Sequence, residues 1–362
     1  MIVKNINLKN FRNYENEKIE FSPSVNVIYG KNAQGKTNIL EGIYLFSMGK
    51  SNRTYHDEEL IKFGENEANL KMDFIGGKRE ISAEIIIKKN NKKRVFINEI
   101  PVKKNSDLVG KFNVCYFGPE CMNIIKSGPS ARRKNLDILI SQLRKNYFSY
   151  LSEYKKAIES KTALLKNEIV DKITLDILND KLISLCFEII KYRFLYIKKI
   201  EEIAKKIQLE ISKEKENIEI KYSSNFGIIE EFDDEKIKQK IKEKFESNYK
   251  KEVFLKEIFI GCHRDDIEYF INGKNVKTFG SSGQQKTVAL VQKIAEVYLI
   301  YEEIGEYPVL LLDDIMSELD EERQSYIISK IKDMQIIITC TDAEKFKNLD
   351  AKEIKIQEGR AL

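Results

Sequence analysis

The sequence predicts an α/β fold that carries a large helical insertion, and three observations support that class. A glycine-rich turn at residues 30–37 stands between a strand-like and a helix-like apolar run, which is the order of a strand–turn–helix unit. Residues 308–314 are predicted as a second buried strand, which ends in two aspartates. Between these features no proline occurs from Pro129 to Pro308, and residues 130–210 are rich in Leu, Ile, Lys and Glu, which favours helices.

The first 120 residues are predicted as strands and turns around one helix. Alternation of apolar and polar residues and short β-branched runs predict the strands. The helix, at residues 37–45, follows directly from the glycine-rich turn. The expected strands are residues 2–8, 25–29, 69–75, 81–88 and 94–97.

A helical insertion is predicted for residues 121–255, and its strongest pattern is an apolar stripe. Steps of four and three residues separate the members of the stripe, which places them on one face of a helix. The insertion could act as a lever or clamp arm, but a helical subdomain with an amphipathic packing face is the favoured interpretation. The stripe consists of Leu178, Leu182, Leu185, Ile189, Tyr192 and Tyr196, and after a one-residue slip it continues at Ile200, Ile203 and Ile207.

The last part of the chain is predicted as strand, helix, strand, helix, strand. Its first helix follows a Ser- and Gly-rich segment and is expected to run to about Glu303, and residues 336–339 form its last clear apolar strand. We therefore expect three domains: residues 1–120, the helical insertion 121–255, and residues 256–362.

Composition narrows the class of protein. The 362 residues can bury a substantial core, and the formal charge of +5 is compatible with nucleic-acid binding through local patches without requiring it. No uncharged apolar run approaches the roughly 18 residues that span a bilayer, and the N-terminus lacks the organisation of a signal peptide. The five scattered cysteines include no CxxC pair, which argues against a disulfide framework or a zinc site. We expect a soluble, cytoplasmic protein with no membrane partner.

The glycine-rich turn fits the phosphate-binding pattern G-x-x-x-x-G-K-[ST] at every specified position. Its backbone N–H groups and the following helix N-terminus would attract anionic oxygens. Lys36 is expected to reach the β- and γ-phosphates of a nucleoside triphosphate, and Thr37 to offer its hydroxyl to Mg²⁺. An ordinary glycine-rich turn is the competing interpretation. The loop consists of Gly30, Lys31, Asn32, Ala33, Gln34, Gly35, Lys36 and Thr37.

The two aspartates that end the strand at residues 308–314 are candidate catalytic groups, together with Lys36. Such a strand has the form of the one that opposes the phosphate loop in nucleotide hydrolases. Asp313 is expected to hold Mg²⁺, and Asp314 to orient or deprotonate the attacking water. Alternatively, both carboxylates cap a helix that starts near Ser317.

Two further segments resemble those of ABC-type ATPases. Residues 279–286 resemble the signature motif, in which Ser281, Gly283 and Gln284 at a helix N-terminus would close over the γ-phosphate bound by a second subunit. A serine-rich helix cap is the alternative. Residues 317–320 read Ser-Glu-Leu-Asp and follow the acidic strand, where these ATPases keep an interface loop. The order of the segments is that of an ABC-type P-loop ATPase head, which implies mixed β-sheets with helices, an inserted helical lid or arm, and a dimeric active unit.

Over nearly its full length the chain resembles the RecF family of bacterial DNA replication and repair ATPases, whose heads are similar to those of SMC and Rad50 proteins. The resemblance implies ATP with Mg²⁺ and an ATP-dependent homodimeric clamp that binds DNA at single-stranded gaps and duplex junctions. It also implies a RecR-like partner, RecA loading and SOS induction. Besides the phosphate loop, the acidic strand and the signature, the segments that carry it are residues 10–14, 38–44, 49–54, 117–120, 126–133 and 263–266.

The resemblance also implies roles for single residues. By position, Arg12 would lie near the nucleotide, and Glu120 would fall in the segment that links the head to the lid. Ala33 stands where the family usually has glycine, which is tolerated if its φ is negative. The switch histidine of transporter ATPases is absent after residues 336–339, and Asp314 stands where transporters usually have Glu. We therefore expect a weak, DNA-stimulated ATPase that works as a switch.

Several cationic clusters are candidates for contacts with DNA phosphates. For each of them a solvated charged surface is an equally good interpretation, because one residue in three is charged. The absence of Trp and of an evident stacking platform favours contacts with the DNA backbone over base reading. The clusters are residues 88–94, which are predicted as a basic hairpin tip, and the pairs Lys103–Lys104, Arg132–Arg133 and Lys198–Lys199.

The alternative function is the nucleotide-binding subunit of an ABC transporter, or another ABC-type ATPase scaffold. The helical insertion and the missing switch histidine argue against a transporter. A long-armed chromosome ATPase is disfavoured because the chain between Lys36 and Gly283 is too short for an extended coiled coil.

Overall fold

The computed structural model describes residues 1–103, 107–229, 231–330, 333–347 and 349–362. They form two compact units. The first joins Met1–Met122 to Lys293–Leu362 and is called the head unit here, and the second, Asn123–Gln292, is called the helical unit. Helix α8 (Ser282–Ile304) begins in the helical unit and ends in the head unit.

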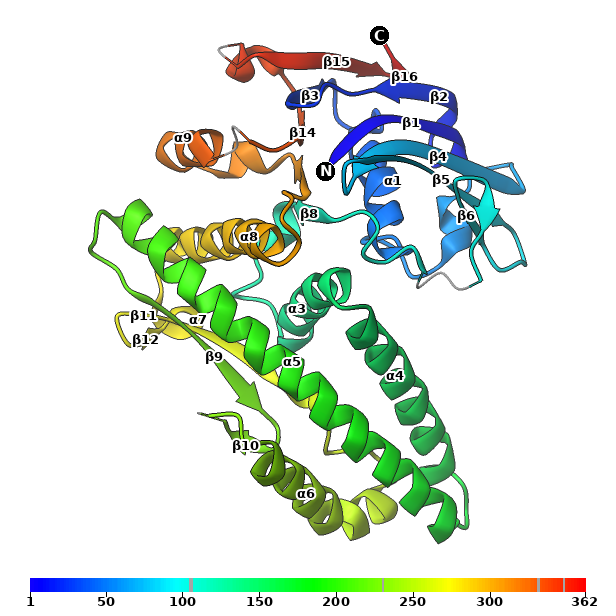
Figure 1. The fold of residues 1–362 in the computed structure, drawn as a ribbon, viewed down its shortest axis with the longest axis vertical. Coiled ribbons are helices and arrows are strands. Elements are labelled where there is room, and N and C mark those ends of the chain that lie inside the picture. The colour runs from blue at the N-terminus through cyan, green and yellow to red at the C-terminus, as the bar shows by residue number, and fades with distance from the viewer. Residues whose placement is uncertain (104–106, 230, 331–332, 348) are drawn as a thin grey trace. The chain divides into compact units, whose positions relative to one another are not determined.

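An antiparallel sheet in the order β2-β1-β4-β5-β6-β7 forms one layer of the head unit (Figure 1). Alternate residues of β4, from Ala68 to Phe74, are buried, so one face of the sheet covers the core. The strands are β1 (Ile2–Phe11), β2 (Tyr14–Glu20), β4 (Glu67–Gly76), β5 (Arg79–Lys88), β6 (Arg94–Ile97) and β7 (Ile100–Pro101).

The second sheet of the head unit has the order β16-β15-β3-β14-β13-β8, and all of its strands except β16 run parallel. Its strands β3, β13 and β14 are short apolar runs, as expected for strands covered on both faces. Parallel strands end at the same edge, so the loops after β3 and β13 meet there. The strands are β3 (Val25–Tyr29), β8 (Val114–Phe117), β13 (Val309–Asp313), β14 (Ile336–Cys340), β15 (Ala351–Gln357) and β16 (Arg360–Ala361).

Helix α1 (Lys36–Met48) contacts strands of both sheets and lies between them (Figure 1). Most of its side chains are buried, which explains its apolar sequence on nearly every face. The shorter helical segments of the head unit are η1 (Asp57–Leu60), α2 (Pro119–Met122), η4 (Ile315–Glu318), α9 (Glu321–Lys330) and η5 (Ala343–Phe346).

The helical unit contains three long helices and a small sheet in the order β10-β9-β11-β12 among its described residues. Helix α5 runs unbroken for 41 residues, starts at the N-cap Asp171, and buries most of the apolar stripe predicted from the sequence. The elements are α3 (Pro129–Leu143), α4 (Lys145–Leu165), α5 (Lys172–Ser212), β9 (Ile218–Ser224), β10 (Gly227–Ile228), α6 (Asp234–Leu255), β11 (Asp266–Ile271), β12 (Lys274–Asn275) and α7 (Val276–Phe279).

The domains expected from the sequence place residues 256–292 in the last domain, whereas the compact units place them in the helical unit. These residues pack within the helical unit, because β11 pairs with β9 along its whole length. Strands β3 and β6 have the predicted bounds, whereas β2 was not predicted. Among the described residues, no helix is both long enough and apolar enough to cross a membrane.

Candidate nucleotide-binding site

The glycine-rich loop connects β3 to α1, and two of its glycines are required by their surroundings. Gly30 has φ 151°, and a Cβ there would lie 2.3 Å from the carbonyl oxygen of Ile356. Gly35 has φ 108°, and a Cβ there would lie 2.5 Å from the side chain of Asn13. Both positions therefore exclude side chains by conformation and by space.

Ala33 does not meet the condition expected for it from the sequence. Its φ is +64°, in the left-handed region, where an alanine is disfavoured by about 1–2 kcal/mol. Glycine at this position would adopt the same backbone without that cost. The loop therefore holds a strained, exposed alanine.

The side chain of Lys36 folds over the loop. Its Nζ donates hydrogen bonds to the carbonyl oxygens of Gly30 at 2.7 Å and Lys31 at 2.9 Å. Burial lowers the pKa of the Lys36 ammonium, an effect that the nearby carboxylate of Asp314 opposes. The ammonium therefore lies inside the loop, next to the N-terminus of α1, where anionic oxygens are favoured.

Asp313 ends β13, and its side chain accepts hydrogen bonds from residues of α1, β14 and β8. The hydroxyl of Thr37 donates to Asp313 Oδ1 at 2.8 Å, which joins the phosphate loop to the acidic strand. Thr339 on β14 donates to the same oxygen at 2.7 Å, and Tyr116 on β8 donates to Oδ2 at 2.9 Å. Asp313 is 4% exposed, so these bonds compensate for the burial of its charge.

Asp314 has a different environment from Asp313. Its side chain is exposed, and its φ of +51° lies in the left-handed region. Its backbone N–H donates a hydrogen bond that the carbonyl oxygen and the hydroxyl oxygen of Thr339 share. Asp314 stands at the N-cap position of η4, but its side chain makes no capping hydrogen bond. The two neighbouring carboxylates thus differ in burial and partners, as groups with separate roles do.

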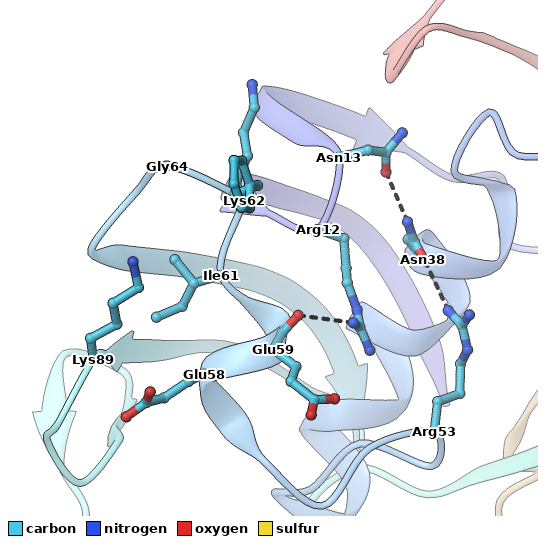
Figure 2. A pocket seen from close by; sticks show the side chains of 11 residues that line it. Arg12, Asn13, Asn38, Arg53, Glu58, Glu59, Ile61, Lys62, Gly64 and Lys89 are labelled. Carbon is cyan, nitrogen blue, oxygen red and sulfur yellow. Dashed lines mark hydrogen bonds between the residues drawn. The ribbon is translucent and has the colours of Figure 1, made fainter.

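A pocket of about 970 Å³ adjoins the phosphate loop and contains Arg12. Asn13 donates to the carbonyl oxygen of Gln34 at 2.9 Å, and Asn13, Asn38 and Arg53 form a hydrogen-bonded row along the pocket (Figure 2). The fully exposed ring of Phe63 also lines it. Asn13 thus links the pocket wall to the loop, and the pocket offers polar groups and one aromatic face.

Arg12 is fixed by Glu41, a carboxylate of α1 that is 1% exposed. Nε and Nη2 of Arg12 donate to the two oxygens of Glu41 at 2.9 and 2.7 Å. Ser51 and Arg53 donate to the same carboxylate. Such a bidentate pair holds the guanidinium plane in one orientation at the pocket wall.

The signature-like segment belongs to the helical unit, at the start of α8. Ser281 Oγ accepts the backbone N–H of Gln284 at 3.1 Å, and Gln284 Oε1 accepts that of Ser281 at 2.9 Å. This reciprocal capping box makes Ser281 a helix cap in the isolated chain. Ser281 and Gly283 are nevertheless exposed at a helix N-terminus.

The segment 263–266 holds the helical unit together. Asp265, which is 0% exposed, accepts hydrogen bonds from Tyr222, Arg193 and the backbone of Asn225. Arg132 forms a bidentate ion pair with Asp266 and is buried, so it is not available to DNA phosphates. The structural role of this segment could not be foreseen from its charged sequence.

The other cationic clusters differ in how exposed they are. The loop between β5 and β6 is a hairpin tip on which Lys89 and Lys92 are exposed, whereas Lys93 pairs with Asp57 at 2.8 Å. Lys198 pairs with Glu201 at 3.7 Å. Lys104 lies outside the described residues.

Three residues of the site were missed in the sequence analysis: Tyr116, Thr339 and Glu41. Tyr116 and Thr339 each lie next to the last residue of an apolar strand, and only the strand order β14-β13-β8 brings both to Asp313. Glu41 was visible as a lone carboxylate in the apolar sequence of α1. A buried charge of this kind signals a paired group.

Comparison with known proteins decides the family. The sequence model described as RecF/RecN/SMC N terminal domain matches residues 2–360. A protein of Clostridium tetani named DNA replication and repair protein RecF is 42% identical over 368 residues, covering 100% of both chains. The chain belongs to the RecF family. A RecF of Bacillus mycoides is 40% identical and covers 98% of this chain and 96% of its own.

Solved structures agree with membership of the RecF family. The structure of the recombination mediator protein RecF–ATPrS in the RecFOR pathway has a TM-score of 0.92 and 37% identity, covering 99% of this chain and 97% of its own. An Smc head domain from Pyrococcus furiosus has a TM-score of 0.57 and 18% identity, covering 99% and 95%, and shows the shared fold. The chain is thus a member of a family of DNA replication and repair proteins with an ABC-type ATPase head, and a transporter subunit is not favoured.

Proposed function

We propose that this protein binds ATP at the phosphate loop and uses it to control a dimeric, DNA-binding state. One observation carries the proposal: the 2.8 Å hydrogen bond from Thr37 to Asp313, which brings the phosphate loop and the acidic strand into one site. Lys36 and the N-terminus of α1 supply positive charge for the phosphates. RecF proteins solved with ATP and ATPrS support the choice of nucleotide.

The residues at this site fit a bound Mg²⁺. Thr37 and Asp313 offer the hydroxyl and carboxylate oxygens that Mg²⁺ takes when it is held mainly by phosphates and water. Consistent with such a shared site, the described residues contain no cluster of three or more His, Cys, Asp or Glu side chains that could hold a metal alone. Bound Mg²⁺ would neutralise charge on the phosphates. Lys36 would bind the phosphates, and Asp314 would orient or deprotonate the attacking water.

The pocket beside the loop supports a place for the nucleoside end of ATP. The bidentate pair with Glu41 fixes Arg12 at the wall of this pocket, next to Asn13 and Asn38. This arrangement supports a place for Arg12 near the nucleotide. We assign the cofactor contacts to residues 30–37 and Arg12 in one chain, and to Ser281, Gly283 and Gln284 of a second chain.

The proposed cycle follows from a nucleotide site to which two chains contribute. ATP would join two chains into a clamp at gaps or single-strand/duplex junctions, with a RecR-like mediator as partner and RecA loading and SOS induction as the outcome. The RecFOR pathway in the name of the solved relative supports the partner. Hydrolysis would be slow and would reset the dimer. In this scheme residues 1–120 and 256–362 work as the head and residues 121–255 as the lid.

Light scattering tests the proposal on the full chain. The mass should double with ATP and Mg²⁺, and gapped duplex DNA should strengthen the dimer. The variant Lys36→Met should stay monomeric, because it removes the ammonium next to the phosphates. DNA binding should weaken as salt rises, since phosphate contacts release counterions. A wild-type chain that stays monomeric with ATP and ignores DNA would contradict the proposal.

A further inference from the structure

The carboxylate of Asp313 is oriented from both sides. Thr37 and Thr339 donate to Oδ1, and Tyr116 donates to Oδ2. Within the described part of the chain, Tyr116 is the sole side chain that donates to Oδ2. The Thr37 hydroxyl can donate to Asp313 while a lone pair of its oxygen faces Mg²⁺, so the threonine hydroxyls hold Oδ1 and Tyr116 holds the opposite oxygen.

Tyr116 is itself tightly held. It is 9% exposed, and its ring packs edge-on against that of Tyr44, with 5.9 Å between the centroids. A Cβ on Gly118 would lie 2.5 Å from the Tyr116 hydroxyl and 2.9 Å from Glu120 Oε2. The chain after β8 therefore turns directly over the hydroxyl, and Gly118 leaves just enough room for it.

We propose that Tyr116 is a positioning residue that fixes the Asp313 carboxylate for Mg²⁺ and so sets how strongly the cation and the nucleotide bind together. The proposal rests on the proposed ATP site. A carboxylate held through one oxygen by a rigid phenol presents its other oxygen in a fixed direction. Without the phenol, the carboxylate would be held through Oδ1 alone, and part of the cation's binding energy would be lost in ordering the other oxygen.

The variant Tyr116→Phe tests this in the full-length chain. Calorimetry gives the affinity for ATP with Mg²⁺ and with EDTA, and the ratio of the two measures the coupling between cation and nucleotide. We expect the ratio to fall about 10- to 100-fold in Tyr116→Phe, as for other groups that orient metal ligands, while the affinity in EDTA stays that of wild type. A ratio equal to that of wild type would overturn the proposal, and so would an equal loss with and without Mg²⁺.

Tyr44→Phe is the matched control. It removes the hydroxyl of the neighbouring buried tyrosine, which makes no hydrogen bond to Asp313 among the described residues. Its ratio should equal that of wild type, and a fall as large as that of Tyr116→Phe would overturn the proposal.

Gly118→Ala is a second variant that keeps the Tyr116 hydroxyl but displaces it. This variant is the test if Tyr116→Phe proves unstable. A fall in the ratio of the ATP affinities with Mg²⁺ and with EDTA supports the proposal, and an unchanged ratio overturns it. Failure of wild type to bind ATP at all would instead contradict the proposed function.

Discussion

At the scale of the residue, we expect His263 to make the stability of the helical unit depend on pH. Its Nδ1 is hydrogen-bonded to the Tyr154 hydroxyl at 2.6 Å. Burial, together with Arg264, Arg133 and other cations, lowers the pKa of His263 to about 4. The folded protein therefore keeps this ring neutral, while the unfolded chain takes up a proton below about pH 6.5.

The sign of the effect follows from this difference in proton binding. The contribution of His263 is complete above pH 6.5 and is lost as the pH falls toward 4. From this group, the free energy of unfolding measured in urea should be about 1 kcal/mol lower at pH 5.5 than at pH 7.5. The loss is no larger because the ring remains partly accessible to solvent. His263→Gln should flatten that part of the profile, and His56→Gln, at the exposed histidine, should not. Parallel profiles for wild type and His263→Gln would contradict the prediction.

Ala33 and Asp314, together with Arg12 nearby, share an unusual backbone conformation. Ala33 in the loop and Asp314 after β13 both have left-handed φ values, +64° and +51°. Each of these conformations costs on the order of 1 kcal/mol, and strain of this kind gathers at functional sites. The two neighbouring aspartates therefore differ in backbone conformation as well as in burial.

At the scale of the element, the β5–β6 hairpin is the best-presented candidate for DNA contact in the head unit. Lys89 and Lys92 are exposed at its tip, while neighbouring Lys88 and Lys93 pair with Glu67 and Asp57. The double variant Lys89→Gln/Lys92→Gln should weaken binding of gapped duplex. It should also reduce the steepness of log affinity against log salt concentration by about 2, because each phosphate contact releases about one counterion.

A charge-matched control keeps this prediction specific. Lys4 and Lys18 lie on β1 and β2, where each pairs with a glutamate. The double variant Lys4→Gln/Lys18→Gln makes the same change in net charge and should leave the salt slope unaltered. Equal slopes for the two double variants would show that the hairpin does not contact DNA.

The elements also show how far sequence reasoning reaches. Local patterns predicted β3, β6 and the N-terminus of α1 because each depends on neighbours in the chain. Strand β2 was missed because its sequence, YENEKIE, is mostly charged, and it forms only by pairing with β1. Tyr116 and Thr339 were missed for a related reason: strand order is not written in any local pattern. The motif residues were predictable, and the side chains that orient them were not.

At the scale of the whole molecule, the phosphate loop and the signature-like segment belong to different units of the chain. The phosphate loop and Asp313 lie in the head unit, whereas Ser281 and Gly283 lie in the helical unit, exposed at the start of α8. The ABC-type order implies that this signature serves the nucleotide of a second copy. A closed two-fold dimer would then contain two composite sites, each with a loop from one chain and a signature from the other.

Mixing two inactive variants tests this arrangement directly. Lys36→Met has an intact signature, and Ser281→Arg has an intact loop, so a mixed dimer contains one complete composite site. An equimolar mixture should recover up to about half of the wild-type ATP hydrolysis, because every dimer that forms on ATP is then a mixed one and has one of its two sites complete. Each variant alone should remain inactive. If loop and signature act within one chain, every site in the mixture has a defect and no activity returns, which would rule out the shared site.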